Sequence, residues 1–130
     1  MDCVATHLTH ARVMATVPAT DIERAREFYE NRLGLRADRA REGELRVHAG
    51  HGTQIRIRQG DPAGPMESVA TFEVHDVETT VLELQSRGVT FVDFDLPGLK
   101  TVDGIARQGS EISAWFRDSE GNLLCVHQST

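Results

Sequence analysis

A chain of 130 residues is long enough for one domain with a hydrophobic core, and 39% hydrophobic and 26% charged residues are usual for a soluble globular protein. Because 14 basic residues stand against 20 acidic ones, the net charge of −6 argues against general binding to nucleic-acid backbones. Cys3 and Cys125 form no C-x-x-C pair and no disulfide framework, and residues 1–13 resemble neither a signal peptide nor a membrane anchor, so we expect a cytoplasmic location.

The first elements in chain order are a strand and a helix. The small and β-branched residues of RVMATV, at 12–17, predict a strand that Pro18 ends. Thr20 and Glu23 have the T-x-x-E spacing of a capping box, which predicts that a helix begins there and that Gly34 ends it. Its apolar side chains recur at helical spacing and are expected in the core: Ile22, Ala25, Phe28, Tyr29 and Leu33.

A hairpin and a long loop complete the first half. Residues 45–49 and 53–59 alternate in polarity and flank a glycine-rich turn, which predicts two paired strands. The loop GDPAGP, at 60–65, contains two prolines and two glycines. It is the expected junction between two halves of the chain.

The second half repeats this order of elements. Its predicted elements are a strand at 68–74, a helix at 76–88 with Asp76 as N-cap, a strand at 89–94, a loop at 95–104, and a hairpin of 111–117 with 122–128. Asp76-Val77-Glu78 matches Asp21-Ile22-Glu23 at an offset of 55 residues. The sequence therefore predicts an α+β fold of two βαβββ modules, about 11–60 and about 66–128, in a single domain of residues 1–130.

Strand alternation divides the side chains into two faces. One set is apolar and is expected to pack on helices; Ile55 and Ile57 are typical members. The opposite set is mixed and would line a cleft, stay solvated or form a dimer contact. Its members are Arg12, Met14, Thr16, Gln54, Arg56, Arg58, Val69, Thr71, Glu73, Leu123, Cys125 and His127.

Three stretches resemble signature sequences of the vicinal oxygen chelate superfamily, the group of glyoxalase I, bleomycin-resistance proteins and extradiol dioxygenases. They are ATVPATDIERAREFYENRLGL (15–35), ATFEVHDVETTVLELQSRGVTF (70–91) and AWFRDSEGNLLCVHQ (114–128), and residues 95–106 resemble a branch of small glyoxalase-like proteins. The resemblance implies a curved, mostly antiparallel eight-stranded sheet around a pocket, with helices on its convex face. It also implies a homodimer.

Metal-using members of that superfamily place His, Glu or Gln ligands at four inward positions. The resemblance assigns these positions to Met14, Arg56, Val69 and Cys125. Divalent transition ions need imidazole, carboxylate or thiolate donors, and a guanidinium would repel them. The set therefore predicts a protein that works without a metal, and glyoxalase I and extradiol chemistry are not expected.

Other candidate groups have a structural alternative each. Arg56 and Arg58 facing Glu73 would either grip an anionic or carbonyl group, with Glu73 as acceptor or base, or form internal ion pairs. Cys125 and His127 would form either a nucleophile–base pair or a packing thiol with a ligand-binding imidazole, and their spacing of about 6.5–7 Å along one strand favours the second.

Trp115 would stack on a flat ligand or sit in the hairpin core, and we favour the core slightly. The H-x-x-H pairs His7–His10 and His48–His51 are expected to be solvated loop residues. No dinucleotide, P-loop or nucleophile-elbow motif is present in the sequence, so no nucleotide cofactor is expected.

Three functions fit these observations. The first is metal-free binding of a small organic molecule in the cleft, in the manner of bleomycin-resistance proteins, with contacts from Met14, Thr16, Arg56, Arg58, Val69, Thr71, Glu73, Trp115, Cys125 and His127. The second is a lyase or isomerase of the glyoxalase type that uses Glu73, His127 and Arg56. The third is a regulatory module with a vestigial pocket. No nucleic acid or membrane partner is expected.

Overall fold

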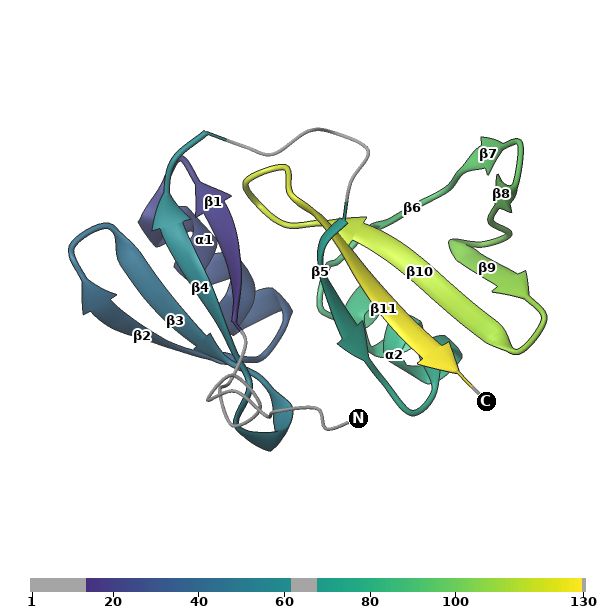
Figure 1. Cartoon of the computed structure of the whole chain (residues 1–130), viewed down its shortest axis with the longest axis horizontal. Helices are drawn as coiled ribbons and strands as arrows, with labels where there is room; N and C mark the ends of the chain where they lie inside the picture. Colours follow the sequence, from purple (N-terminus) through teal and green to yellow (C-terminus); the bar gives the residue numbers. More distant parts are fainter. Residues whose placement is uncertain (1–13, 62–67, 130) are drawn as a thin grey trace, which may run out of the picture.

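Two α-helices and eleven strands make up the described part of the chain in this computed structural model, residues 14–61 and 68–129 (Figure 1). Sheet A contains, in spatial order, β1 (Ala15–Ala19), β4 (Gln54–Gln59), β3 (Glu44–His48) and β2 (Arg36–Arg41). Sheet B contains β5 (Ser68–Glu73), β11 (Leu123–Ser129), β10 (Glu111–Arg117) and β6 (Phe91–Val92), with β9 (Ile105–Gln108) also paired to β10. The fold is therefore α+β, as expected.

The single eight-stranded sheet that we predicted is not formed by backbone pairing in these residues. β1 pairs in parallel with β4, and β5 pairs in parallel with β11. The two first strands lie next to each other without exchanging ladder hydrogen bonds, so each is an edge of its own sheet (Figure 1). The two open sheets therefore lie edge to edge along this seam.

Three strand assignments also differ from the prediction, and one of them is β9 (Ile105–Gln108), which was not predicted. β2 was not predicted, because RADRAR has no alternating apolar side chain and buries only Ala37. The predicted loop at 95–104 contains a short hairpin of β7 (Asp95–Leu96) and β8 (Leu99–Lys100). β2 and this hairpin are edge elements whose pairing depends on tertiary context more than on side-chain pattern.

The first helix begins one residue later than its capping box predicts. α1 (Ile22–Glu27) is capped by Asp21, whose carboxylate accepts a hydrogen bond from the Arg24 amide at 3.0 Å, and a π-helical turn, η2 (Phe28–Arg32), continues it. Pro18 does not end the strand. It lies within β1 opposite Arg58, which is allowed because β1 is an edge strand and its free side needs no N–H donor.

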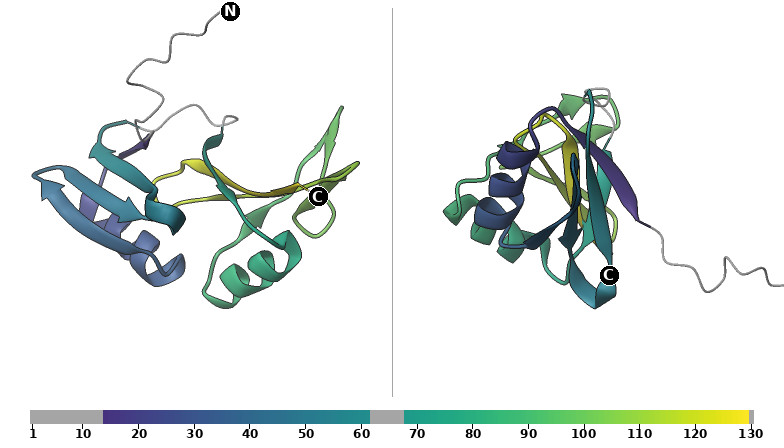
Figure 2. Two further views of the ribbon diagram at one scale, coloured as in Figure 1. Left: turned by 60° about the horizontal axis from the view of Figure 1, so that its bottom comes forward. Right: turned by 90° about the vertical axis from the view of Figure 1, so that its left-hand side faces the viewer.

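The second helix matches the prediction. α2 (Val77–Ser86) is capped by Asp76 and buries Val77, Val81 and Leu84. The ends of the two helical segments are joined by reciprocal hydrogen bonds: Arg32 donates to the Arg87 carbonyl at 3.2 Å, and Arg87 donates to the Arg32 carbonyl at 3.0 Å. Both helices lie on the same side of the sheets (Figure 2).

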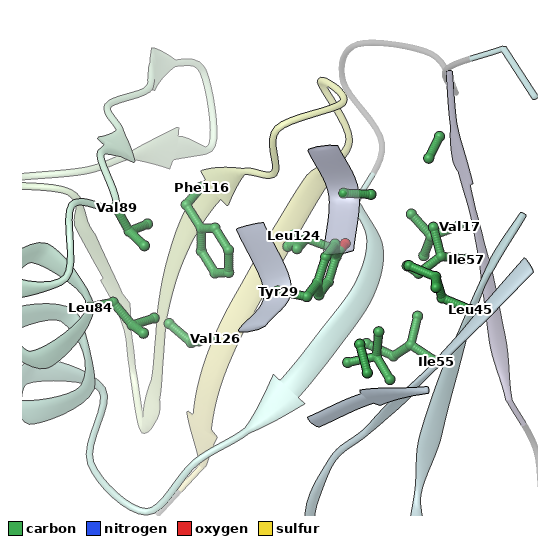
Figure 3. Close-up of a cluster of buried hydrophobic side chains, with 14 of the residues drawn as sticks. Val17, Tyr29, Leu45, Ile55, Ile57, Leu84, Val89, Phe116, Leu124 and Val126 are labelled. Carbon is green, nitrogen blue, oxygen red and sulfur yellow. The ribbon is translucent and has the colours of Figure 1, made fainter. Parts of the chain in front are cut away.

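The hydrophobic core fills the space between helices and sheets and continues across both halves (Figure 3). It includes the predicted apolar faces of the strands and the helices, and Phe91 and Phe116 meet edge to face at 5.4 Å. Its fully buried members include Val17, Tyr29, Leu45, Ile57, Phe116, Leu124 and Val126. We call the opposite, helix-free side of each sheet its outer face.

The turn between β10 and β11, residues 118–122, connects the second half to the first. The buried Tyr29 hydroxyl donates to Asp118 Oδ2 at 2.7 Å, and Asn122 Nδ2 donates to the Pro18 carbonyl at 2.7 Å. Glu120 also reaches across to the start of α1. The stretch FRDSEGN, residues 116–122 of the third signature sequence, therefore has a structural role in this chain.

Glu120 is the most thoroughly bonded carboxylate in this turn. It accepts hydrogen bonds from Thr20 Oγ1, the Asp21 amide and the Arg24 guanidinium at 2.6–3.0 Å. Burial opposes its ionisation, but these hydrogen bonds outweigh burial and lower the pKa of Glu120 to about 2. Thr20 thus donates to Glu120 and does not cap α1.

Candidate functional site

Two rows of polar side chains cross the outer face of sheet B. Each row follows the strand pairing from β5 through β11 to β10. The first row is Thr71, Cys125 and Trp115, and the second is Glu73, His127 and Ser113. The alternation of these strands predicted the shared face of the residues on β5 and β11.

His127 is held between two carboxylates. Its Nδ1 lies 2.6 Å from Glu73 Oε2, and its Nε2 lies 2.6 Å from Glu111 Oε1. The hydrogen bonds to Glu111 and Glu73 raise the pKa of His127 despite partial burial. When protonated, the imidazolium can donate from both nitrogens to the two carboxylates, and it then acts as a hydrogen-bond donor or acid with no lone pair available as a base.

Cys125 is buried and makes no pair with His127. Its thiol donates to the Val126 carbonyl at 3.5 Å, and burial raises its pKa above the ordinary thiol value in spite of hydrogen bonding with Ser113. A neutral buried thiol is a poor nucleophile and a poor metal ligand. The site residue Cys125 therefore lines the face between Thr71 and Trp115.

The predicted arginines lie on sheet A and do not contact Glu73. Arg56 donates to Thr16 Oγ1 at 3.2 and 3.3 Å from its two nitrogens. Arg58 lies 3.8 Å from the carboxylate of Glu44. No contact among the described residues joins Arg56 to the Glu73–His127 pair, because the nearest partners of the two arginines, Thr16 and Glu44, lie on sheet A.

A cavity of about 390 Å³ lies at the seam between the two sheets. It extends from the turn after β3, η3 (Gly50–Gly52), to the end of β5. Its wall is mainly apolar, and Thr71 and Glu73 supply polar groups at the β5 side. Its lining residues are Ala15, Ala49, Gly50, His51, Thr53, Gln54, Ile55, Ala70, Thr71, Phe72 and Glu73.

The four positions that the resemblance assigns to a metal do not fit one. Arg56 is a cation bonded to Thr16, and the thiol of Cys125 favours its protonated form. Val69 offers no donor atom and packs against the hydrophobic core where the β5–β11 pairing shifts register, and it is not among the residues that line the cavity described above. In the described ranges, no group of three His, Cys, Asp or Glu side chains is placed to hold a metal ion.

The remaining predicted residues are placed as follows. Met14 is half-buried just before β1, and Trp115 meets Phe94 edge to face at 5.6 Å. His48 is bonded to Asp38 at 2.8 Å, whereas His51 lines the cavity. The predictions for Cys3, His7, His10, Arg12 and Val13, and most of the 60–65 junction, lie outside the described residues.

Sequence reasoning missed several residues of this region. Glu111 could have been found from the final hairpin, because a turn at 118–121 fixes the register that places Ser113 opposite His127 and Glu111 diagonal to it. His51 and the apolar Phe72 could not, because they depend on how the two sheets meet at the seam.

The model of the Glyoxalase/Bleomycin resistance protein/Dioxygenase superfamily matches residues 7–126. No curated protein matches the sequence. Among the described residues no helix is long and apolar enough to span a membrane.

Solved structures share the fold at low sequence identity. TnmS3, an antibiotic binding protein from Streptomyces sp. CB03234, is 21% identical with a TM-score of 0.69, over 99% of this chain and 100% of the other. A glyoxalase family protein from Bacillus anthracis is 18% identical with a TM-score of 0.70, over the full length of both chains. A glyoxalase/bleomycin resistance protein from Streptomyces sp. CB03234 is 22% identical with a TM-score of 0.66, over 91% and 100%.

Proposed function

The chain belongs to the glyoxalase/bleomycin resistance/dioxygenase superfamily, and from this premise we propose that it binds a small organic molecule in the cavity between its two sheets. The observation that carries the proposal is the cavity itself. Its volume of about 390 Å³ is in the range of small-ligand sites, and its apolar wall ends in the polar groups Thr71 and Glu73. An antibiotic-binding protein among the structural neighbours supports the same class of function.

The wall chemistry favours a ligand with an apolar body and a cationic or hydrogen-bond-donating group. Phe72 and Ile55 offer apolar contact area inside the cavity. Glu73 keeps one carboxylate oxygen beyond the one bonded to His127, and Glu111 adds a second negative charge nearby. With His127 protonated, this end of the site has one net negative charge, so an ammonium group would be attracted to Glu73.

Binding without a metal is part of the proposal. The donor chemistry of Met14, Arg56, Val69 and Cys125 supports it. Elemental analysis of the purified protein should find no stoichiometric Ni, Zn, Mn or Fe; one equivalent of any of them that resists dialysis would contradict this part.

A lyase or isomerase is the second candidate, and the 2.6 Å contact between Glu73 and His127 favours it. In such a reaction His127 would deliver a proton and Glu73 would accept one. Arg56 is not in contact with this pair, so the three-residue arrangement that we predicted is reduced to two. Turnover of a 2-oxoaldehyde–thiol adduct that is lost in Glu73→Gln would favour this function over sequestration.

Duplication of a βαβββ unit, assembly as a homodimer and a cytoplasmic location remain predictions. The equivalent N-caps Asp21 and Asp76 and the reciprocal Arg32–Arg87 bonds, both 55 residues apart, support the duplication. Sedimentation of the purified protein would measure the oligomeric state directly.

The binding proposal is tested with 1-naphthylmethylamine as probe, followed by calorimetry. Thr71→Phe places a ring at the cavity wall and should weaken binding by at least about tenfold, because a tenfold loss needs only about 1.4 kcal/mol of lost contact. Thr90→Phe changes an exposed threonine away from the cavity and should leave affinity unchanged. 1-Naphthoic acid, the anion of similar shape, should bind more weakly than the amine.

Two results would overturn the proposal. One is equal affinity of the amine for both variants and the parent, which would place the binding elsewhere. The other is no saturable heat with the amine, the acid or neutral 1-naphthalenemethanol, which would leave the third function, a module with a vestigial pocket.

A further inference from the structure

A second charged region lies on the outer face of sheet A, at the other end of the β3–β4 pair from the cavity. Glu44 lies opposite Arg58 at this end, whereas His48 lies opposite Gln54 at the cavity end. Four residues along a strand separate the two ends by about 13 Å. This region is therefore distinct from the site proposed above.

The centre of the region is the buried carboxylate of Glu44. Its side chain is 2% exposed, although Arg41 and Arg58 beside it are largely exposed. Arg46 Nε donates to Glu44 Oε2 at 3.0 Å, and Arg41 and Arg58 lie 3.6 and 3.8 Å from Oε1. The carboxylate is thus buried beneath guanidinium groups that are themselves partly to largely exposed.

The positive charge of this region exceeds what Glu44 neutralises. Arg46 lies directly opposite Arg56 in the β3–β4 pairing, and the charge of Arg56 also acts on Glu44. Three guanidiniums thus lie within 4 Å of one carboxylate. The other carboxylate beside this group, Asp38 opposite Arg46, is paired with Arg36 and His48, so arginines outnumber the carboxylates around Glu44 in a chain whose net charge is −6. Like charges directly across a strand pair are destabilising unless an anion compensates them.

Donor groups are available to bind such an anion. Within the part of the chain that the structure describes, Arg41 and Arg58 donate no hydrogen bond, since their distances to Glu44 exceed the hydrogen-bonding range. Arg56 donates only to the Thr16 hydroxyl among these residues, which is uncharged. Guanidinium groups bind phosphate and carboxylate through paired N–H donors.

We propose that the outer face of sheet A carries an anion-binding site, formed by Arg41, Arg46, Arg56 and Arg58 around the buried carboxylate of Glu44, that takes a small molecule bearing a phosphate or several carboxylate groups. Glu44 holds the guanidiniums together before the anion arrives. The site does not depend on the cavity, so each of the two proposals can fail without the other.

Calorimetric titration of the full chain with inorganic phosphate and, separately, with citrate tests the site. Both anions should give saturable binding that weakens as sodium chloride is raised. Tighter phosphate binding would identify a phosphate-bearing ligand, and tighter citrate binding a polycarboxylate. Arg58→Gln should weaken binding by about tenfold, as expected for loss of one charge-assisted contact.

The matched control is Arg39→Gln. Arg39 is a similarly exposed arginine on β2 whose partner is Glu23, so this variant removes the same charge outside the cluster. Its affinity should stay within twofold of the parent. Equal losses in Arg58→Gln and Arg39→Gln would show a nonspecific effect of net charge and overturn the proposal. Absence of saturable binding of either anion to the parent would also overturn it.

Discussion

Two buried glutamates of this protein have opposite surroundings. Glu120, in the turn between β10 and β11, receives hydrogen bonds from Thr20, the Asp21 amide and Arg24. Glu44, at the start of β3, receives one hydrogen bond from Arg46 and lies among further arginines at longer distance. Both side chains are almost fully buried, with 1% and 2% exposure.

We interpret the buried charge of Glu120 as one that stabilises the fold, and the buried charge of Glu44 as part of the proposed anion-binding site. Hydrogen bonds to both oxygens of Glu120 come from the Asp21 amide and the Arg24 guanidinium in the other half of the chain, so its charge is compensated within the fold. Around Glu44 one hydrogen bond comes from Arg46, and Arg41 and Arg58 lie farther away and remain largely exposed. The first arrangement fixes the two halves together, and the second leaves a surface able to attract anions.

The largest expected effect is on Glu120. Glu120→Gln keeps the shape but removes the charge that Arg24 and the Asp21 amide need, so the free energy of unfolding should fall by about 3 kcal/mol. Urea denaturation measures this free energy. Glu42→Gln, at an exposed position in the β2–β3 turn, should change it little; equal losses in the two variants would contradict the structural role of Glu120.

The dependence of the free energy of unfolding on pH should also reveal the role of Glu120 in acid. The pKa of Glu120 is lowered in the folded state from 4.5 to about 2. Its contribution is therefore complete above about pH 4.5 and is lost as the pH falls toward 2. Stability measured across this range should fall less steeply in Glu120→Gln than in the parent, and identical slopes would refute the assignment.

A smaller loss of stability, one that an anion can reverse, is expected for Glu44. Glu44→Gln leaves Arg41, Arg46 and Arg58 without their shared counter-ion, so the variant should be less stable than the parent but more stable than Glu120→Gln. Added phosphate should restore much of this loss, because it replaces the missing negative charge. If phosphate raises the stability of Glu120→Gln and Glu44→Gln equally, the comparison between the two sites fails.

The smallest effect on stability concerns His127. Its pKa is raised by Glu111 and Glu73, so its contribution is fully present below about pH 6.5 and is lost as the pH rises through the folded-state value. An NMR titration of the His127 ring should give a midpoint above the ordinary histidine value of about 6.5. Glu111→Gln should lower this pKa, whereas Glu83→Gln, on α2, should leave it unchanged.

Local patterns predicted most of the fold correctly. The period of α2 identified Val77, Val81 and Leu84 as buried, and strand alternation separated Ile57 from Arg56. These features depend on neighbours within one element or one hairpin. Edge elements such as β2 were missed because their side chains face solvent on both sides, and their pairing is decided by the adjacent strand.

The candidate site was only partly predictable for a related reason. Alternation placed Glu73 and His127 on one face, and the structure brings them within 2.6 Å. Alternation could not predict that Arg56 would bond to Thr16 on sheet A and stay away from Glu73 on sheet B. The distance between residues on different sheets depends on how β1 and β5 meet at the seam. Contacts across that seam have no signal in the spacing of residues along the chain.

The most direct test of small-molecule binding is a map of amide chemical shifts during titration with 1-naphthylmethylamine. Binding in the cavity predicts that the perturbed amides cluster on both sides of the seam, at Ala15, Gln54 and the segment from Ala70 to Glu73. Perturbations confined to another surface, or an unchanged spectrum at saturating amine, would contradict the account.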